Sequence, residues 1–236
     1  MICFLTSLPV IEETDEINPA NRFLIELRRC IASPCRALYI CSDPDCDNTY
    51  WSQSLKKEFE AAGFVFSSFA VLDGRTEKRA KELIGSADFI ILTGGHVPTQ
   101  NRFFHKIGLT ALLQGFDGVL MGISAGSMNS AETVYAQPEE PGEAVDPKYE
   151  RFLPGLGLTK IMLLPHYYGI KDGTLDGLRI LEDITLPDSM GKTFYFIPDG
   201  TCLYIEPGRT ELRGEAYRVR DGVIMKVSQE GDVLTL

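Results

Sequence analysis

The ten residues VLMGISAGSM, at positions 119–128, join an apolar strand to a helix through a turn of small residues. Residues 119–121 are apolar and indicate a short buried strand that ends at Gly122. We expect a helix to begin directly after Ser124. Because a strand that leads into a helix is the repeating unit of α/β proteins, strands and helices should alternate on both sides of this stretch.

The N-terminal half shows that alternation. Apolar and aromatic runs predict strands at residues 36–41, 64–72 and 88–92. Amphipathic patterns predict helices at residues 18–31, 47–63, 76–84 and 99–113. The first helix should begin at Asn18-Pro19 and the fourth at Thr99. In the second helix we expect Trp51, Leu55 and Phe59 to form one apolar face.

The second half begins with an acidic loop. Residues 137–150 contain three prolines and five carboxylates, and apolar strands resume at Ile161, so we expect an exposed loop and no linker between domains. Further strands are predicted at residues 161–164 and 194–198, with a helix at residues 175–181 between them. Residues 216–219 and 223–227 predict a hairpin across the turn Arg220-Asp221-Gly222.

These elements predict an α/β fold with a mostly parallel, doubly wound sheet, helices on both faces and a small antiparallel C-terminal hairpin. A chain of 236 residues can bury a large core without disulfide or metal support. We therefore expect a single domain over residues 1–236.

The composition narrows the classes of function. The chain carries 33 acidic and 23 basic residues, a net charge of −10, which disfavours binding to nucleic acids and anionic membranes. No apolar run approaches the roughly 18 residues of a membrane-spanning helix. The first eleven residues lack the basic start of a signal peptide. Six cysteines without a CxxC pair favour a reducing, cytoplasmic location.

The pattern Gly122-Ile123-Ser124-Ala125-Gly126 is typical of a nucleophile elbow. A side chain two residues before or after such a nucleophile would collide with neighbouring backbone, which favours glycine at both positions. The turn also places Ser124 at a helix N-terminus, where free amides stabilise developing negative charge. A glycine-rich structural turn is the alternative interpretation.

A serine nucleophile needs a base, and the chain has only three histidines. His166 follows the apolar strand at residues 161–164 and should face the crevice at the carboxyl end of a parallel sheet, where ligands bind. His96 follows a glycine pair and is a candidate to line the site, whereas His105 lies inside a predicted helix. We expect His166 to be the base.

The spacing of the sequence does not determine which carboxylate orients the base. Asp199 follows the strand at residues 194–198, while Glu139 and Glu140 follow the elbow helix. The oxyanion requires two donors, for which the backbone amides of Gly95 and Ala125 are candidates.

No cofactor or metal motif accompanies this site. The run DPDCDN at residues 43–48 is only faintly similar to a calcium loop, because Asn48 and Ser54 stand where glycine and glutamate are required. We expect a turn and a helix cap there. Neither a GxGxxG after the first strand nor a P-loop is present, so nucleotide binding has no support and no cofactor is expected.

Four segments together resemble the peptidase E family of aspartyl dipeptidases: LTGGH (92–96), GISAGSM (122–128), LGLTKIMLLPHY (156–167) and FIPDGT (196–201). The resemblance covers most of the chain and implies a serine peptidase on a class I glutamine-amidotransferase-like sheet. It implies Ser124 as nucleophile, His166 as base and Asp199 as acid. It also implies that Gly94 and Gly95 contribute to the oxyanion site.

The chain differs from the family at residues that are expected to contact the substrate. The family often has asparagine after the glycine pair, where this chain has His96, and peptidase E carries basic residues after its Pro-His-Phe segment, where this chain has tyrosines. Selection of an N-terminal aspartate needs a cation. The candidate substrate-binding residues are His96, Tyr167, Lys171 and Arg179.

We therefore expect a serine exopeptidase that hydrolyses short peptides, with N-terminal aspartate as one candidate first residue. The alternatives are a cyanophycin-degrading peptidase of the same family, a carboxylesterase, and a non-catalytic binding protein on the same scaffold. The expected partner is a small peptide, without nucleic acid or membrane, and the protein is expected to be a monomer or a homodimer.

Overall fold

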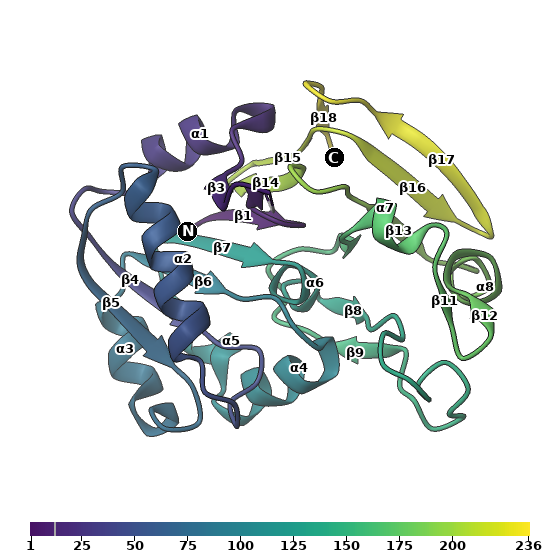
Figure 1. Ribbon diagram of the computed structural model, residues 1–236, viewed down its shortest axis with the longest axis horizontal. Helices are drawn as coiled ribbons and strands as arrows, with labels where there is room; N and C mark the ends of the chain where they lie inside the picture. The colour runs from purple at the N-terminus through teal and green to yellow at the C-terminus, as the bar shows by residue number, and fades with distance from the viewer. Residues whose placement is uncertain (12) are drawn as a thin grey trace.

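The fold is built around an eight-stranded sheet (Figure 1). The structure is a computed structural model and describes residues 1–11 and 13–236. Strand order is β18-β15-β14-β1-β7-β6-β4-β5. Five neighbouring strands are parallel: β1 (Ile2–Thr6), β7 (Val119–Ile123), β6 (Phe89–Leu92), β4 (Cys35–Ile40) and β5 (Phe66–Leu72). Three antiparallel strands complete it: β14 (Cys202–Glu206), β15 (Arg209–Arg213) and β18 (Val233–Thr235).

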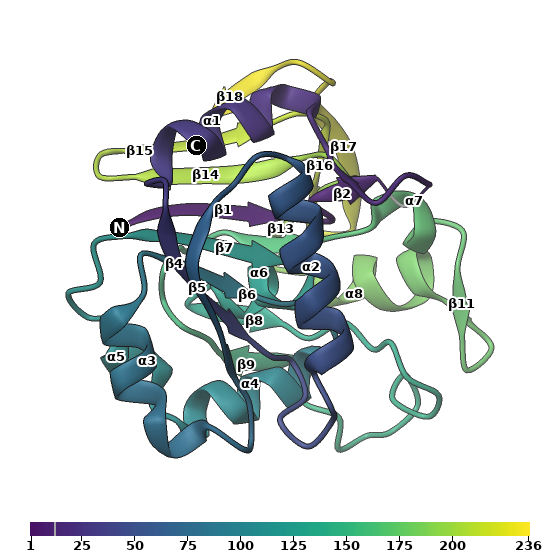
Figure 2. The ribbon, with the colours of Figure 1, turned by 60° about the vertical axis from the view of Figure 1, so that its left-hand side comes forward.

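Helices cover both faces of this sheet, as the sequence predicts. They are α1 (Phe23–Cys30), α2 (Thr49–Ala61), α3 (Ala80–Ser86), α4 (Val97–Lys106), α5 (Leu109–Leu112) and α6 (Ala125–Asn129). Successive strand residues point to opposite faces, so Phe4 packs in the cluster of α1 and α2 and Leu5 packs in the cluster of α3, α4 and α5. Figure 2 shows α2 in front of the central strands.

A second sheet lies beside the first and has the order β10-β13-β16-β17. Its strands are β10 (Met162–Leu164), β13 (Thr193–Phe196), β16 (Ala216–Arg220) and β17 (Val223–Ser228). β10 and β13 are parallel, and β16 and β17 form an antiparallel pair. A third apolar cluster, which includes Val97, Ala125, Leu164 and Phe194, joins this sheet to α4 and α6.

Short elements occupy the connections. They are β2 (Val10–Ile11), β3 (Glu16–Ile17), η1 (Ala20–Arg22), η2 (Glu77–Arg79), β8 (Thr133–Tyr135), β9 (Phe152–Pro154), α7 (Tyr167–Ile170), β11 (Thr174–Leu175), β12 (Leu178–Arg179), η3 (Ile180–Thr185) and α8 (Leu186–Asp188). None of the helices within residues 1–11 and 13–236 combines the length and the apolar character needed to cross a membrane.

Three predictions about helices are wrong. The helix predicted at residues 175–181 is the hairpin β11–β12 followed by the π-helical turn η3, because Asp176 and Gly177 both have positive φ and form a tight turn. The fourth helix begins at Val97, two residues before Thr99, and it breaks at Gly108 (φ 65°). Trp51 does not face the core with Phe59, since it is 66% exposed.

Candidate active site

The register of the parallel strands brings several chain segments to one edge of the main sheet. Thr6 of β1 pairs with Ile123 of β7, and Leu92 of β6 pairs with Gly122. The residues that follow these strands, Ser7, Ser124 and Thr93, therefore lie together at the carboxyl ends, where open parallel sheets bind ligands.

Ser124 has the strained backbone expected of an elbow nucleophile. Its φ of 47° and ψ of −110° lie outside the regions favoured by L-residues, and α6 begins at the next residue. A Cβ at Gly122 would come within 2.8 Å of the Ser127 amide nitrogen, and a Cβ at Gly126 would collide with the carbonyl of Leu92. Both positions therefore require glycine, because any larger side chain would collide with neighbouring backbone atoms.

The structure brings Ser124, His166 and Asp199 together from three strand ends. His166 Nε2 lies 2.9 Å from Ser124 Oγ, and His166 Nδ1 lies 2.9 Å from Asp199 Oδ1. His166 follows β10 with a left-handed backbone (φ 56°), and Asp199 follows β13. Because β10 and β13 are adjacent parallel strands, their carboxyl ends hold the imidazole and the carboxylate side by side.

Ser7 is a functional candidate that the sequence analysis missed. It is completely buried, its hydroxyl donates a hydrogen bond to Asp199 Oδ1, and its Oγ accepts the backbone N–H of His166 at 2.8 Å. One hydroxyl group thus ties the end of β1 to the residues that follow β10 and β13. The only signal in the sequence is its place directly after an apolar strand.

The ionisation of Asp199 suits an orienting carboxylate. Burial raises the pKa of Asp199, but the hydrogen bonds from His166 and Ser7 outweigh burial and leave the pKa below the ordinary value. Glu139, one of the rival acids, is bonded to another group: its Oε1 accepts the backbone N–H of Val97 at 3.0 Å. Of the three acids that spacing leaves open, Asp199 is the one hydrogen-bonded to His166.

The glycine pair after β6 lies against the nucleophile. A Cβ at Gly94 would be 3.4 Å from the Cβ of Ser124, and Gly95 has a φ of 141°, which strongly favours glycine. As the first residue of α6, Ala125 has an amide without an acceptor inside the helix. The Gly126 amide donates to Thr93 O and is not available. Gly94, Gly95 and Ala125 therefore remain the candidate oxyanion donors.

The four predicted substrate-binding side chains are engaged elsewhere. His96 contacts Thr99 Oγ1 and Glu143 Oε1, both at 2.8 Å, and Tyr167 stacks on Tyr217 with ring centroids 4.0 Å apart. Lys171 lies 3.6 Å from Asp172, and Arg179 forms an ion pair with Asp183 at 2.6 Å. None of the four lines either of the two cavities beside Ser124.

Two cavities flank Ser124. The first, here called the triad cavity, measures about 320 Å³ and is lined by Val97, Ser124, Met128, Glu139, His166 and Ile170, among others. The second, here called the aromatic cavity, measures about 660 Å³ and extends from Gly94, Gly95 and Ile123 to Tyr50 and Trp51. Both lie in the size range of small-ligand sites.

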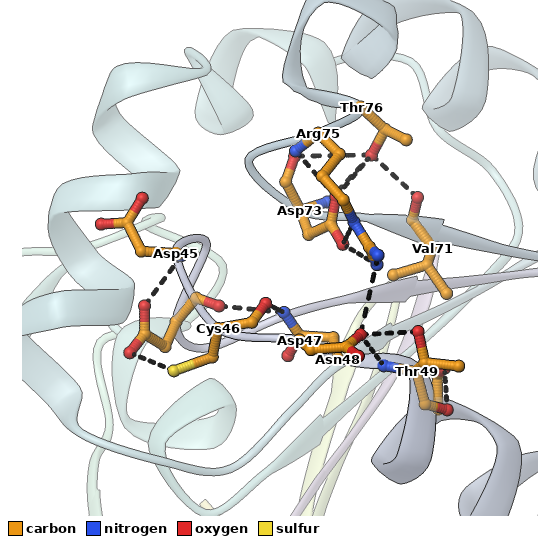
Figure 3. Close-up of polar contacts among 11 residues, drawn as sticks. Asp45, Cys46, Asp47, Asn48, Thr49, Val71, Asp73, Arg75 and Thr76 are labelled. Carbon is orange, nitrogen blue, oxygen red and sulfur yellow. Dashed lines mark hydrogen bonds and ion pairs between the residues drawn. The ribbon is translucent and has the colours of Figure 1, made fainter.

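Two acidic clusters bear on the expectation that no metal binds. His96, Glu140 and Glu143 place ligand atoms within 4.8 Å of one another, but His96 and Glu143 already hydrogen-bond each other. In the run at residues 43–48, Asp47 Oδ1 accepts the backbone N–H of Thr49 at the start of α2 and lies 3.6 Å from Arg75 (Figure 3). That run forms a turn that leads into a helix.

Comparisons with known proteins place this chain in a family. The model of peptidase family S51 matches residues 22–213. The fold is similar to that of a peptidase from an acI-B1 Actinobacterium (TM-score 0.64, 16% identity, covering 100% of this chain and 96% of that chain). It is also similar to a protein from Listeria monocytogenes EGD-e whose description names peptidase E (TM-score 0.56, 16% identity, covering 96% and 98%). No curated protein matches the chain in sequence. Since the family model covers most of the chain, the protein belongs to peptidase family S51, the peptidase E family, and is a serine-type peptidase.

Proposed function

We propose that the protein is a serine exopeptidase that hydrolyses short peptides, with Ser124, His166 and Asp199 as its catalytic residues. The main support is the pair of 2.9 Å contacts that link the hydroxyl to the imidazole and the imidazole to the carboxylate. This order of groups is that of a serine-hydrolase triad. The backbone of Ser124 gives further support, because the strained turn at φ 47° is the conformation in which an elbow nucleophile projects away from the sheet.

The acylation step follows from these contacts. His166 Nε2 accepts the hydroxyl proton of Ser124 while Oγ attacks the scissile carbonyl carbon. Asp199 accepts the N–H at Nδ1, which fixes the tautomer and stabilises the imidazolium that forms. The negative charge on the carbonyl oxygen is taken up by backbone amides at Gly95 and Ala125.

Breakdown of the tetrahedral intermediate returns the proton. His166 Nε2–H donates it to the leaving amine, so the C–N bond breaks and the acyl group stays on Ser124 Oγ. Water then attacks this ester with His166 again as the base. The bond between the acyl carbon and Ser124 Oγ breaks, His166 returns the proton to Oγ, and the free acid leaves. The chain's own residues carry every proton transfer in this scheme.

The triad cavity supports cleavage next to a free amino terminus. Glu139 lines it together with Ser124 and His166, and within the described part of the chain only Oε1 of its carboxylate has a hydrogen-bond partner. The other oxygen is available to an ammonium group, for which a carboxylate is the ordinary partner.

An aspartate side chain has no evident cation in either cavity. Among the described residues, neither the triad cavity nor the aromatic cavity is lined by lysine or arginine. The preference for N-terminal aspartate that the resemblance implies therefore stays a prediction, and the cavity walls do not favour it. Cytoplasmic location, monomeric or dimeric state and lack of nucleic-acid or membrane partners likewise stay predictions.

The test is hydrolysis of a dipeptide panel by the purified protein and by Ser124→Ala. We expect the substitution to lower kcat by at least about 10⁴-fold while the circular dichroism spectrum is unchanged, since the nucleophile alone is removed. N-acetylated dipeptides should not be cleaved. A fluorophosphonate probe should label Ser124 of the unmodified protein.

Other results would favour other functions. Turnover of aryl esters without any dipeptide would favour a carboxylesterase, and cleavage of β-aspartyl-arginine would favour the cyanophycin-degrading alternative. Unchanged hydrolysis in Ser124→Ala would reject the proposed nucleophile, and lack of labelling would favour a binding protein.

A further inference from the structure

The aromatic cavity adjoins the reaction centre, although the mechanism above does not use it. One wall consists of Leu8, Pro9 and Val10, which directly follow Ser7. Another wall consists of Gly94, Gly95 and Ile123, which precede or oppose Ser124. A peptide whose scissile carbonyl lies at Ser124 can therefore place a neighbouring side chain in this cavity.

Two aromatic side chains at the start of α2 line the cavity without being buried. Tyr50 is 71% exposed and Trp51 is 66% exposed, and their rings meet edge to face with centroids 5.2 Å apart. Neighbouring Ser52 is buried, which fixes the helix face that carries the two rings. Exposed rings of this size beside a cavity present π faces, which attract cations and apolar groups.

Two carboxylates line the same cavity. Glu58 lies two helical turns after Trp51 on α2, and Asp15 lies in the turn between β2 and β3. Ser54 Oγ donates a hydrogen bond to Glu58 Oε1 at 3.1 Å, which orients that carboxylate. Burial raises the pKa of Glu58, the hydrogen bond from Ser54 lowers it, and the nearby Asp15 raises it, so that the pKa lies above its ordinary value.

Within residues 1–11 and 13–236, no positive charge on the cavity wall balances these carboxylates. The residues that line it in the described chain include no lysine, arginine or histidine. α2 carries two lysines before Glu58, Lys56 and Lys57, and neither lines the cavity. Lys56 Nζ lies 3.5 Å from the carboxylate of Glu60, which does not line the cavity either. Aromatic faces with an uncompensated carboxylate pair form a site complementary to an ammonium or guanidinium group on an aliphatic stem.

We propose that the aromatic cavity is a substrate subsite for a basic side chain, lysine or arginine, next to the scissile bond. This inference rests on the proposed function, because a substrate subsite presupposes that peptides are hydrolysed at Ser124. The aliphatic stem packs against Trp51 and Tyr50, and the charged end pairs with Glu58 and Asp15. The basic residue precedes or follows the scissile bond, and the test distinguishes the two positions.

Binding to Ser124→Ala tests the inference without catalysis. The ligands are two matched pairs, Lys-Ala with Nle-Ala and Ala-Lys with Ala-Nle, in which norleucine lacks only the ammonium group. Trp51 is the only tryptophan of the chain, so its fluorescence reports occupation of this cavity. Calorimetry gives the same dissociation constants independently of the ring.

We expect the basic member of at least one pair to bind about tenfold more tightly than its neutral partner. Preference in the first pair assigns the basic residue before the scissile bond, and preference in the second assigns it after. Glu58→Gln should reduce the difference to less than about twofold, because glutamine keeps the shape and removes the charge. Glu60→Gln, an exposed position on the same helix, should leave it unchanged.

Equal binding within both pairs, or tighter binding of Asp-Ala than of all four ligands, would overturn the inference. Persistence of the preference in Glu58→Gln would also overturn it. Basic-selective binding by a protein that hydrolyses no peptide would reject the proposed function and leave the subsite standing. Hydrolysis without basic selectivity would reject only the subsite.

Discussion

Ser7 contacts two members of the proposed triad through one hydroxyl group. It donates to the Asp199 carboxylate and accepts the backbone N–H of His166, and all of it is buried. The side chains of His166 and Asp199 are 39% and 46% exposed, so solvent restrains them little. Ser7 is therefore a positioning residue, which holds the carboxylate and the histidine at the distance that proton transfer needs.

We expect Ser7→Ala to lower kcat about tenfold with KM nearly unchanged. The substitution leaves the backbone N–H of His166 and one lone pair of Asp199 without their hydrogen-bond partner. Leaving a buried donor or acceptor unsatisfied costs about 1–3 kcal/mol of free energy. Steady-state kinetics on the best dipeptide measures it. The rate of labelling by a fluorophosphonate should fall in parallel.

A matched control separates this role from general loss of a buried hydroxyl. Ser127 is equally buried and its hydroxyl donates to Thr6 O at 2.7 Å, so this hydroxyl is bonded to a strand carbonyl and not to a side chain of the proposed triad. Ser127→Ala should lower stability and leave kcat within about twofold, because only a structural hydrogen bond is lost. A similar loss of kcat in both variants would argue against a positioning role for Ser7.

At this scale the residues themselves indicated the nucleophile and the base, but they left the acid open between Asp199 and the two glutamates after the elbow helix; the family resemblance implied Asp199. Ser124 lies in G-x-S-x-G, His166 follows a strand, and Asp199 lies in a Pro-Asp-Gly segment. Ser7 has no motif, since its partners lie 159 and 192 residues away. Its contacts arise only when three strand ends converge, and no local pattern records that.

The elbow is the element whose shape depends most on residue size. Gly126 is the second residue of α6, where its backbone passes so close to β6 that a Cβ would collide with the Leu92 carbonyl. Gly122 meets the backbone of Ser127 in the same way. The nucleophile is therefore held between two backbone contacts, one on each side.

We expect Gly126→Ala to lower the free energy of unfolding by about 1–3 kcal/mol, because the added methyl group forces β6 and α6 apart. The displacement should also lower kcat, since it moves Ser124 relative to His166. Urea denaturation measures the first effect and dipeptide hydrolysis the second.

Gly85 supplies the control for this prediction. It is exposed in α3, and nothing lies within 4 Å of a Cβ added there. Gly85→Ala should raise the free energy of unfolding by up to about 1 kcal/mol. Alanine gives the unfolded chain less conformational freedom than glycine and therefore favours the helix. Equal effects of the two substitutions would show that the contact with Leu92 is not restrictive.

Elements were predictable where burial alone determines them. The central parallel strands are continuous apolar runs, because helices cover both faces, and the sequence indicates them within a few residues. The hairpin β11–β12 was missed because Leu175, Leu178 and Leu181 repeat with helical spacing, whereas the turn at Asp176 and Gly177 determines the structure.

The whole sheet was less predictable than its strands. The doubly wound core with helices on both faces agrees with the prediction, but the antiparallel strands β14, β15 and β18 in the main sheet were not predicted. β14 pairs with β1, about the full length of the chain away, in the register Phe4–Tyr204. Such long-range pairing depends on topology, which a local pattern of apolar residues does not record.

The net charge of −10 acts on the substrate as a whole-molecule property. Because a field of this sign extends over the Debye length, it attracts cationic peptides and repels acidic ones before any contact forms. Glu139 in the triad cavity, together with Glu58 and Asp15 in the aromatic cavity, adds local negative charge to the cavity walls. The global and the local charge thus favour the same class of substrate.

The negative field predicts opposite salt dependences for cationic and acidic peptides. The Debye length falls from about 30 Å at 0.01 M to about 3 Å at 1 M, so added salt screens the field. Between 0.01 and 0.5 M NaCl, kcat/KM for the better basic peptide, Lys-Ala or Ala-Lys, should fall about three- to tenfold, while its norleucine counterpart changes by less than about twofold. Any turnover of Asp-Ala should rise. Because Glu60→Gln changes the net charge by only one unit, it should leave the salt dependence nearly intact, whereas Glu58→Gln should lower the basic preference at every salt concentration. A parallel salt response of the basic and neutral peptides would contradict electrostatic selection by the molecule.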